Sequence, residues 1–372
     1  MSAMSKRITT VCGDIAPEQL GVTSLHEHTF LDLRIAGGFL KNYFRNIPES
    51  RLAFKPENFA FLKTGVYLVS DECAVVDDMD FLEKEYGFFK ADGGQSVVDC
   101  SPIGVRGDVQ KIRELSEKTG LNIICATGVY TMTSRPPELL GKDAAFYYET
   151  FKREVEEGID GTDIRPGLLK AAIATYGPDG RLMQGELDGV IACARLSAET
   201  GLSVHIHTDP NVRGEDVIAA AKLAIESGAA PDKVHICHMD NRLAAHIPVG
   251  DYLRKSEVGR NICLDTHKTL LDLGVTIGLD TWGMPITNNN FFVTDDFERL
   301  KALMNLIDLG YADQITLGND FSSRLLGRSY GNYGCTRFME FALPMLRQYG
   351  YEAAIGKLVT DNPARILAYL LT

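Results

Sequence analysis

The chain has 372 residues, of which 45% are hydrophobic and 24% charged, values typical of a globular protein. Its formal net charge of -12 argues against nucleic acid or an anionic membrane as a partner, because both would repel it. No window approaches the roughly 18 apolar residues of a membrane-spanning helix. The opening MSAMSKRITT lacks the apolar centre of a signal peptide, and eight cysteines without a C-x-x-C pair indicate reduced thiols, so a cytoplasmic location is expected.

Short apolar, β-branched runs recur along the chain, and each is followed by turn residues and a longer amphipathic stretch. There are eight: the run that ends at 26–28, then 97–100, 123–130, 168–174, 204–208, 234–239, 275–281 and 315–320. Near-continuous apolar strands indicate burial on both faces, as in a parallel sheet. The stretches between them, such as 108–119 and 185–200, have a helical pattern. Eight such units predict an α/β fold, a closed (β/α)₈ TIM barrel.

Two stretches interrupt this rhythm. Residues of about 31–95, after the first strand, and 241–268, after the sixth, are too long for ordinary barrel loops. The first is expected to hold extra helices. Neither has the composition of a disordered linker, so both are interpreted as insertions in one domain that spans residues 1–372.

The first strand ends in Ser24-Leu25-His26-Glu27-His28. Residues two apart on a strand point to the same face, so His26 and His28 can reach one ion together. By itself an H-x-H pair is as often structural as ligating. Its place shifts the balance, because catalytic residues of TIM barrels lie at the C-terminal ends of the strands.

Three further candidates occupy equivalent places. His207 ends the fifth run, His238 ends the sixth and Asp320 ends the eighth. Each alone could be a hydrogen-bonded core residue, but together they would converge on one end of the barrel. Imidazole and carboxylate ligands suit zinc, which is the expected ion, with manganese, cobalt or iron as alternatives.

Lys170 stands in the otherwise apolar strand Gly167–Ala172. An isolated buried ammonium costs several kcal/mol, so this lysine must be neutralised, paired or modified. Burial also predicts a lowered pKa for Lys170, which would favour reaction with CO₂. The resulting carbamate has two oxygens that can bridge two cations. A Schiff-base lysine is the alternative, but it would leave the histidine set unexplained.

This set of residues resembles the metal signature of the phosphotriesterase family, within the amidohydrolase superfamily. The resemblance covers nearly the whole chain apart from the two insertions. Further matching segments are 11–15, 25–28, 96–99, 126–130 and 361–365. The loops 280–283 and 321–335 are more similar to the phosphotriesterase-related and lactonase branch than to the phosphotriester-degrading members.

The resemblance implies a centre of two divalent ions. It makes His26 and His28 ligands of the buried ion, completed by Asp320, and His207 and His238 ligands of the exposed one. The Lys170 carbamate would bridge both ions. A hydroxide between them would attack the substrate, and Asp320 would accept its proton and pass it to the leaving group. The resemblance also implies a small-molecule substrate and a homodimer.

Other residues near the strand ends are secondary candidates. Tyr130 is predicted to hydrogen-bond the substrate or the hydroxide as a catalytic residue, or else to pack. Asp280, Arg324, Arg328 and Lys268 are predicted substrate contacts, with loop anchoring or pairing with nearby acids as the alternatives. Five residues rank lower as ligands or pocket walls: His205, His235, His246, His267 and Trp282. Cys100 and Cys237 lie near the site but lack a paired base, so no catalysis is assigned to them.

The resemblance therefore implies a hydrolase of carboxylic esters, with a lactone as the favoured substrate. Hydrolysis of a phosphotriester or an amide is the alternative within enzymes. Two other interpretations remain open: a ligand-binding barrel without catalysis, and a deaminase with one ion and no carbamate.

Overall fold

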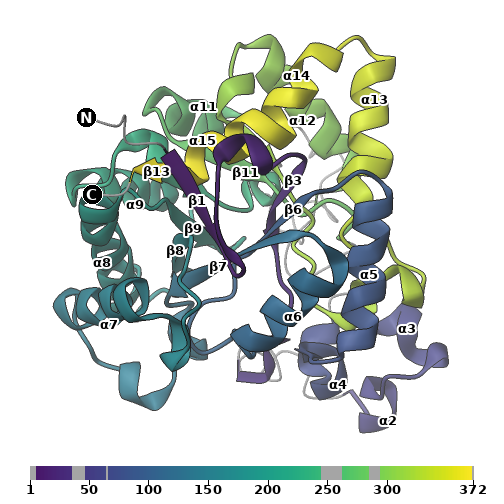
Figure 1. Cartoon of the computed structure of the whole chain (residues 1–372), viewed down its shortest axis with the longest axis horizontal. Coiled ribbons are helices and arrows are strands. Elements are labelled where there is room, and N and C mark those ends of the chain that lie inside the picture. Colours follow the sequence, from purple (N-terminus) through teal and green to yellow (C-terminus); the bar gives the residue numbers. More distant parts are fainter. Residues whose placement is uncertain (1–5, 36–46, 64–65, 244–261, 285–293, 371–372) are drawn as a thin grey trace.

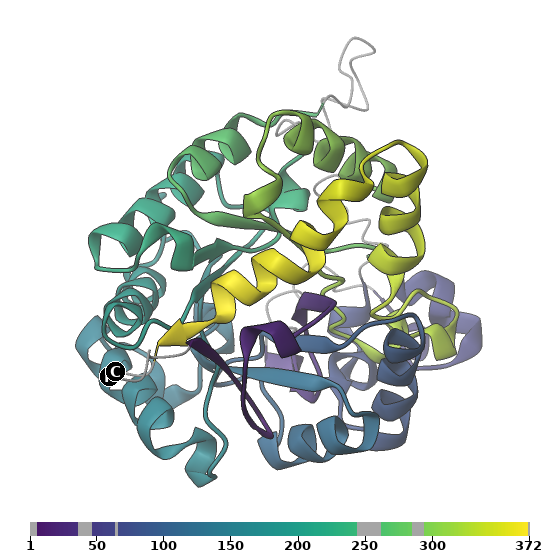
Figure 2. The same ribbon diagram turned by 45° about the horizontal axis from the view of Figure 1, so that its top comes forward.

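The computed structural model describes residues 6–35, 47–63, 66–243, 262–284 and 294–370. Eight parallel strands form one sheet that curls into a barrel (Figures 1 and 2). In chain order they are β3 (Thr23–Glu27), β6 (Ser96–Asp99), β7 (Asn122–Gly128), β8 (Leu168–Ile173), β9 (Val204–Thr208), β10 (Val234–Ile236), β11 (Thr276–Leu279) and β12 (Ile315–Leu317). Each pairs with the next, and β12 lies against β3. The predicted (β/α)₈ barrel and its eight strands are confirmed.

The alternation of side chains along a strand separates the outer core from the barrel interior. In β8, Leu169, Ala171 and Ile173 belong to the large apolar cluster between sheet and helices. Lys170 lies between these residues in the sequence, so its side chain points to the other face of the strand, into the barrel. There it contacts His26 of β3, which is three strands away in the sheet. A strand has a period of two residues, so the same apolar run can both pack a helix and present a polar group inside.

Helices surround the sheet (Figure 2). Those that follow barrel strands are α5 (Met79–Ala91), α6 (Val109–Thr119), α7 (Ala144–Glu157), α8 (Gln184–Thr200), α9 (Gly214–Glu226), α11 (Asp265–Asp272) and α12 (Asp296–Asp308). The predicted helices 108–119 and 185–200 are α6 and α8. Asp108 begins α6 by accepting a hydrogen bond from the Gln110 amide, and Gly120 ends it at φ 64°. The left-handed backbone of that C-cap favours glycine.

The N-terminal end of the barrel is covered. The strands β1 (Lys6–Thr10), β2 (Gly13–Ile15) and β13 (Tyr369–Leu370) form a small antiparallel sheet. The last helical segments are a π-helix (Phe338–Ala342), α13 (Leu343–Gln348), α14 (Glu352–Gly356), a second π-helix (Lys357–Asp361) and α15 (Asn362–Leu367). Asn362 donates to the Ile315 carbonyl at 2.7 Å, which holds α15 at the start of β12. This leaves the C-terminal strand ends for a site.

The stretch after the first barrel strand holds the extra helices that the sequence predicts. Its elements are β4 (Leu31–Asp32), α2 (Glu49–Leu52), α3 (Pro56–Leu62), a 3₁₀ helix (Val66–Val69), α4 (Asp71–Ala74) and β5 (Val75–Val76). After β10 come the 3₁₀ helix η7 (Met239–Arg242) and then α11. His246 and the central part of the insertion 241–268 lie outside the described residues.

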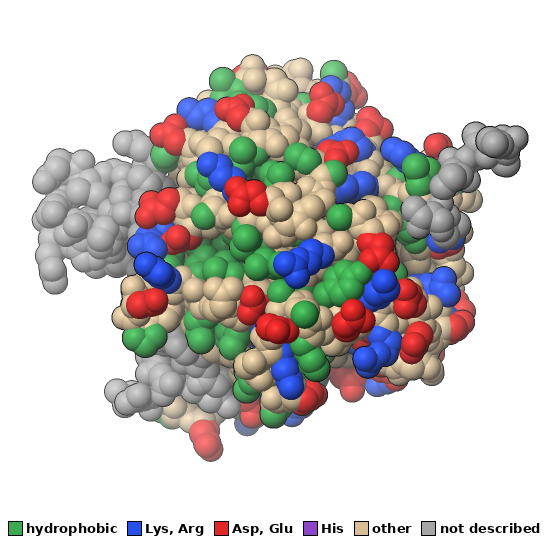
Figure 3. Space-filling model, turned by 90° about the vertical axis from the view of Figure 1, so that its left-hand side faces the viewer, with side chains coloured by type: hydrophobic (Ala, Val, Ile, Leu, Met, Phe, Trp, Pro, Cys, Tyr) green, Lys and Arg blue, Asp and Glu red, His purple; other side chains and the backbone are tan. Residues whose placement is uncertain are grey.

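The face in Figure 3 shows acidic and basic side chains interspersed, with small apolar patches between them. This face therefore has no broad region of one charge sign. Among the described residues, no helix is both long and apolar enough to cross a membrane.

Candidate metal centre

His26 in β3 and His28, which directly follows β3, lie at the C-terminal end of the barrel, His26 inside it and His28 at its rim. His26 is 1% exposed, and its Nδ1 lies 3.0 Å from Oδ2 of Asp280 on the chain after β11. Nδ1 of His28 lies 2.8 Å from Oγ of Ser101, which follows β6. A histidine whose Nδ1 is held in this way presents Nε2 to a metal ion.

Asp280 holds two of the predicted ligands at once. Its Oδ1 lies 2.9 Å from Nδ1 of His238 and also accepts the His238 backbone N–H at 2.9 Å. Its other oxygen binds His26. Asp280 is 1% exposed and both of its oxygens are engaged, so the structure favours a positioning role for it over a substrate contact. The sequence did not reveal this role, because it depends on how β11 lies beside β10 and across from β3.

Asp320 stands where β12 meets β3. Oδ1 of Asp320 lies 3.1 Å from Nε2 of His28 and 3.9 Å from Nε2 of His26. The Asp320 amide donates to the His26 carbonyl at 3.0 Å. A Cβ on Gly318 would come within 2.9 Å of the backbone N and O of His26, so this close approach requires glycine.

Asp320 has φ 52°, in the left-handed region that is costly for a residue with a Cβ. Glu27 holds the backbone on both sides of it. The Glu27 carboxylate accepts the Asn319 amide at 2.9 Å and the Phe321 amide at 2.8 Å. It also accepts the Asn319 side-chain amide at 2.7 Å. Burial raises the pKa of Glu27 to about 7. Glu27, between the two histidines, thus positions Asp320.

Lys170 is 1% exposed, and Nζ lies 3.4 Å from Nε2 of His26 and 3.4 Å from Sγ of Cys237. Burial lowers the pKa of Lys170, but the nearby Cys100, Cys237 and Asp280 side chains outweigh it and raise the pKa above its ordinary value. The predicted lowering of the Lys170 pKa is therefore wrong for this arrangement, because burial is only one of the effects on this side chain and its neighbours outweigh it.

His207 and His238 complete the ring of histidines. Their ring centroids are 4.7 Å apart, and those of His26 and His238 are 4.5 Å apart. The Tyr130 hydroxyl, just beyond β7, lies 3.3 Å from both ring nitrogens of His207. His238 has φ 59°, a second left-handed residue at the centre. The structure thus brings together all six predicted ligands and Tyr130.

The charges at the centre suit cations. Burial opposes ionisation of Asp320, but His238, His28 and His26 outweigh it and lower the pKa of the carboxyl. Burial, with Lys170 next, lowers the pKa of His26 to about 3, so this imidazole is neutral. Neutral nitrogens and ionised carboxylates are the forms that bind divalent ions. Potential ligand atoms of His26, His28 and Asp320 lie within 4.8 Å of one another, as do those of His26, His238 and Asp280. The donor set therefore fits the expected ions.

Two of the predicted substrate contacts lie elsewhere. Lys268, on the first turn of α11, pairs with Asp265 at 2.8 Å. Arg328 pairs with Asp92 at 3.2 Å and with Glu340 at 3.1 Å. Local ion pairs thus account for both side chains, and substrate binding by Lys268 and Arg328 stays a prediction.

Arg324 is likewise engaged with neighbouring side chains. It lies 3.5 Å from Asp78 and stacks 5.2 Å over Phe54, both in the region after the first barrel strand. These three residues line a cavity of about 550 Å³ whose walls include none of the predicted ligands. Contacts with Asp78 and Phe54 therefore explain the position of the Arg324 side chain without a substrate at the centre.

The lower-ranked residues are packed in the core. Trp282 is 1% exposed and donates to the Leu279 carbonyl at 2.9 Å, so it packs rather than walls a pocket. His267 is fully buried and its Nε2 lies 2.8 Å from the Met239 carbonyl. Sequence reasoning missed Ser101, Glu27 and Asn319 as positioning residues. A polar residue adjoining a predicted ligand in an apolar strand was the signal for Glu27 and Asn319.

A (β/α)₈ barrel whose C-terminal strand ends gather histidines and carboxylates is typical of enzymes that use metal ions. The comparison of sequences narrows the class. The chain belongs to the phosphotriesterase family, whose sequence model matches residues 6–367.

Relatives and neighbours agree with this membership. An "N-acetyltaurine hydrolase" of Xenopus tropicalis is 24% identical over 374 residues, which cover 99% of this chain and 100% of the relative. A resiniferatoxin-binding protein from Rhodobacter sphaeroides is 27% identical, with a TM-score of 0.80 over 97% of this chain and 94% of that one. A mutant of a PTE-like lactonase from Deinococcus radiodurans is 27% identical, with a TM-score of 0.71 over 97% and 99%. The chain is a hydrolase of this family.

Proposed function

We propose that the chain hydrolyses a carboxylic ester, with a lactone as the favoured substrate, at a centre of two divalent ions. The ligands would be His26, His28, Lys170 as its carbamate, His207, His238 and Asp320. The observation that carries the proposal is the convergence of these side chains, with Nδ1 of His26 and His238 held by one carboxylate. When bound, the ions would supply Lewis acidity and lower the pKa of water toward neutrality.

The chain's own groups would then handle protons and position the substrate. Burial opposes ionisation of Asp320, but three nearby histidines lower its pKa and keep it ionised at neutral pH. It could therefore accept a proton from the attacking water. Asp320 would return that proton to the leaving oxygen. The Tyr130 hydroxyl, beside His207, would donate to the carbonyl oxygen of the substrate. Lys170 would react with CO₂ to form an N–C bond and release a proton, which yields the bridging carboxylate.

A second candidate is hydrolysis of an N-acyl amide. It is favoured by the relatives named N-acetyltaurine hydrolase, which match this chain over its whole length. Both substrates have an acyl carbon as the electrophile, so the same groups would serve either one. Since Arg324 and Arg328 bind other residues, they give no reason to require an anionic group on the substrate.

The test is a panel of lactones, N-acyl amides and organophosphates with zinc-loaded protein and with the Lys170→Ala and Asp320→Asn variants. We expect the highest kcat/KM on a lactone and loss of turnover in both variants. Lys118→Ala is the matched control, because Lys118 in the last turn of α6 pairs with Glu83 and Glu114, and it should retain activity. Absence of turnover of all three classes by protein with two bound ions would leave a ligand-binding barrel instead.

A further inference from the structure

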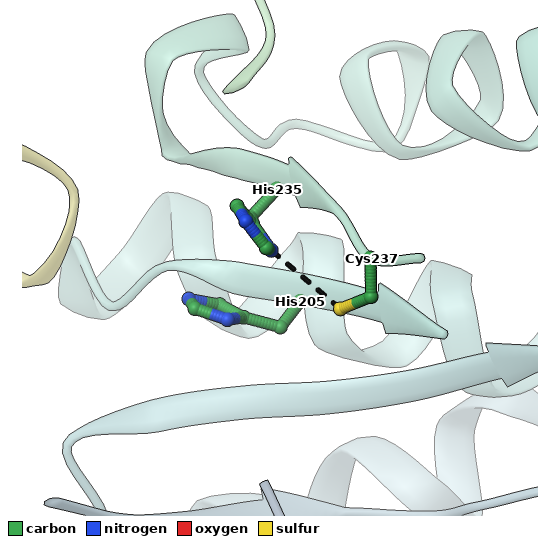
Figure 4. Close-up of side chains that lie close together, drawn as sticks. All are labelled: His205, His235 and Cys237. Atoms are coloured by element: carbon green, nitrogen blue, oxygen red, sulfur yellow. Dashed lines mark hydrogen bonds between the residues drawn. The ribbon is translucent and has the colours of Figure 1, made fainter. Parts of the chain in front are cut away.

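A second group of potential ligands lies deeper in the barrel. It consists of His205 on β9, His235 on β10 and Cys237 just after β10, all of them 0% exposed (Figure 4). His205 and His235 are partners in the parallel register of β9 and β10, so the two side chains stand next to each other. Their ring centroids are 4.6 Å apart. The proposed hydrolytic centre uses none of the three.

The hydrogen bonds of His235 determine which of its nitrogens carries the proton. Nε2 of His235 lies 2.9 Å from the Thr316 hydroxyl, and that hydroxyl donates to the Ile277 carbonyl at 3.4 Å. Thr316 therefore accepts from Nε2–H, which leaves a lone pair on Nδ1. This Nδ1 faces Sγ of Cys237 at 3.5 Å, the contact drawn in Figure 4.

His205, on the neighbouring strand β9, also has its Nε2 beside a hydroxyl. Nε2 of His205 lies 3.0 Å from the Ser203 hydroxyl, while its Nδ1 is buried and has no hydrogen-bond partner. A buried polar atom without a partner costs about 1–3 kcal/mol, so a group that pairs with Nδ1 would be favoured. A metal-bound imidazole usually has its other nitrogen held by a hydrogen bond, and here a hydroxyl holds that nitrogen in both histidines.

We infer that His205, His235 and Cys237 form a site for one thiophilic metal ion beneath the hydrolytic centre. Potential ligand atoms of the three lie within 4.8 Å of one another. Ligands of a single ion at about 2.0–2.3 Å lie roughly 3.3–4 Å apart, so small side-chain rotations close the site. Binding releases the thiol proton of Cys237, and the N–H that a Lys170 carbamate retains would donate to the thiolate, since Nζ lies 3.4 Å from Sγ.

Cu⁺ fits the site best. Two imidazoles and one thiolate form a trigonal set that suits copper. Cu⁺ with one thiolate is also neutral overall, and a neutral group is the least costly to bury in a dry interior. Zn²⁺ also accepts sulfur and nitrogen ligands, but with a single thiolate it would leave a net positive charge in this buried site.

The test uses the full chain with the exposed thiols removed by Cys12→Ser and Cys263→Ser, because these would bind soft metals on the surface. Cobalt-loaded protein should contain three ions per chain and show thiolate-to-cobalt absorption, which the hydrolytic centre cannot produce without a sulfur ligand. Adding Cys237→Ser should reduce the count to two and abolish the absorption. Cys100→Ser, which removes another fully buried thiol, should keep both.

A second arm titrates Cu⁺ without oxygen against a copper-binding dye. We expect one tight Cu⁺ per chain, with an affinity about 10–100-fold weaker in Ser203→Ala and in Thr316→Val, which lose the outer hydrogen bonds. These two variants keep all three ligands, so they test the site even if Cys237→Ser does not fold. Tight, sulfur-ligated zinc in place of copper would support the site with the other ion. Two ions per chain, no sulfur signature and normal hydrolysis would overturn this inference and leave the proposed function intact.

Discussion

Asp280 shows how one buried carboxylate organises the centre. It accepts hydrogen bonds at both oxygens from two predicted ligands, His26 and His238. The two histidines hold the pKa of Asp280 well below its usual range even though burial opposes ionisation. A carboxylate in this position sets the ring orientation of both histidines and directs their Nε2 atoms toward an ion.

Asp280→Asn should therefore weaken ion binding more than catalysis. The amide keeps one acceptor and replaces the other with a donor, so one histidine loses its support. We expect zinc affinity to fall about 10–100-fold, with turnover recovered at excess zinc. A competition titration with a coloured chelator measures the affinity. Asp272→Asn, which affects a surface bond to Tyr311, is the control. Unchanged affinity would contradict the positioning role.

At the scale of elements, the contact between β12 and β3 both closes the barrel and places Asp320. Gly318 lets the two strands approach, and Glu27 holds the amides on both sides of Asp320. The strained backbone of Asp320 is stable only because its neighbours hold it. Closure of the sheet and geometry of the centre thus depend on the same few residues.

Gly318→Ala should therefore disturb both stability and activity. Its Cβ would lie 2.9 Å from the His26 backbone, which cannot yield without opening the strand contact. We expect a loss of about 1–3 kcal/mol in the free energy of unfolding, together with reduced kcat. Denaturant unfolding measures the first. Gly87→Ala in α5 is the control, since its Cβ would meet nothing within 4 Å and alanine favours a helix. Equal effects of the two substitutions would refute this account.

Helix α11 carries a buried histidine that makes stability depend on pH. Burial lowers the pKa of His267 to about 4 from an ordinary value of 6.5. Between these values the unfolded chain binds the proton and the folded chain does not, so stability falls as the pH falls from 6.5 to 4.

His267→Gln keeps a donor for the Met239 carbonyl but cannot titrate. Relative to this variant, the wild-type protein should lose roughly 3 kcal/mol more in the free energy of unfolding between pH 7 and pH 4. Urea unfolding of both proteins in the presence of a chelator measures the difference. Parallel pH profiles for the two proteins would mean that His267 titrates normally.

For the whole molecule, the proposed ligands come from β3, β8, β9 and the ends of β10 and β12. Each ion that binds only the folded barrel would stabilise it by about 4 kcal/mol at a thousandfold excess over Kd, so two ions would contribute about 8 kcal/mol. Removal of both ions with a chelator should lower Tm by roughly 10 °C, given the size of the chain. Calorimetry with and without chelator measures this shift. Lys170→Ala should show a smaller one, and an unchanged Tm after loss of both ions would contradict the proposed centre.

Much of the architecture could be predicted from the sequence because it depends on local periodicity. Apolar runs at regular intervals predicted the eight strands, and the place of His28, His207, His238 and Asp320 at strand ends predicted which side chains converge. Parallel strands in a barrel all end on the same side, so position along a strand is enough to identify that end. The single domain of 1–372 and the homodimer stay predictions.

Only the tertiary structure decided what each side chain touches. Asp280 binds two histidines, Arg324 and Arg328 bind acids away from the centre, and neighbours raise the pKa of Lys170 against the effect of burial. The grouping of His205, His235 and Cys237 likewise follows from the register of β9 and β10. These contacts join residues far apart in the chain, and a hydrogen bond or a charge acts over a few ångströms in space, which a linear pattern does not specify.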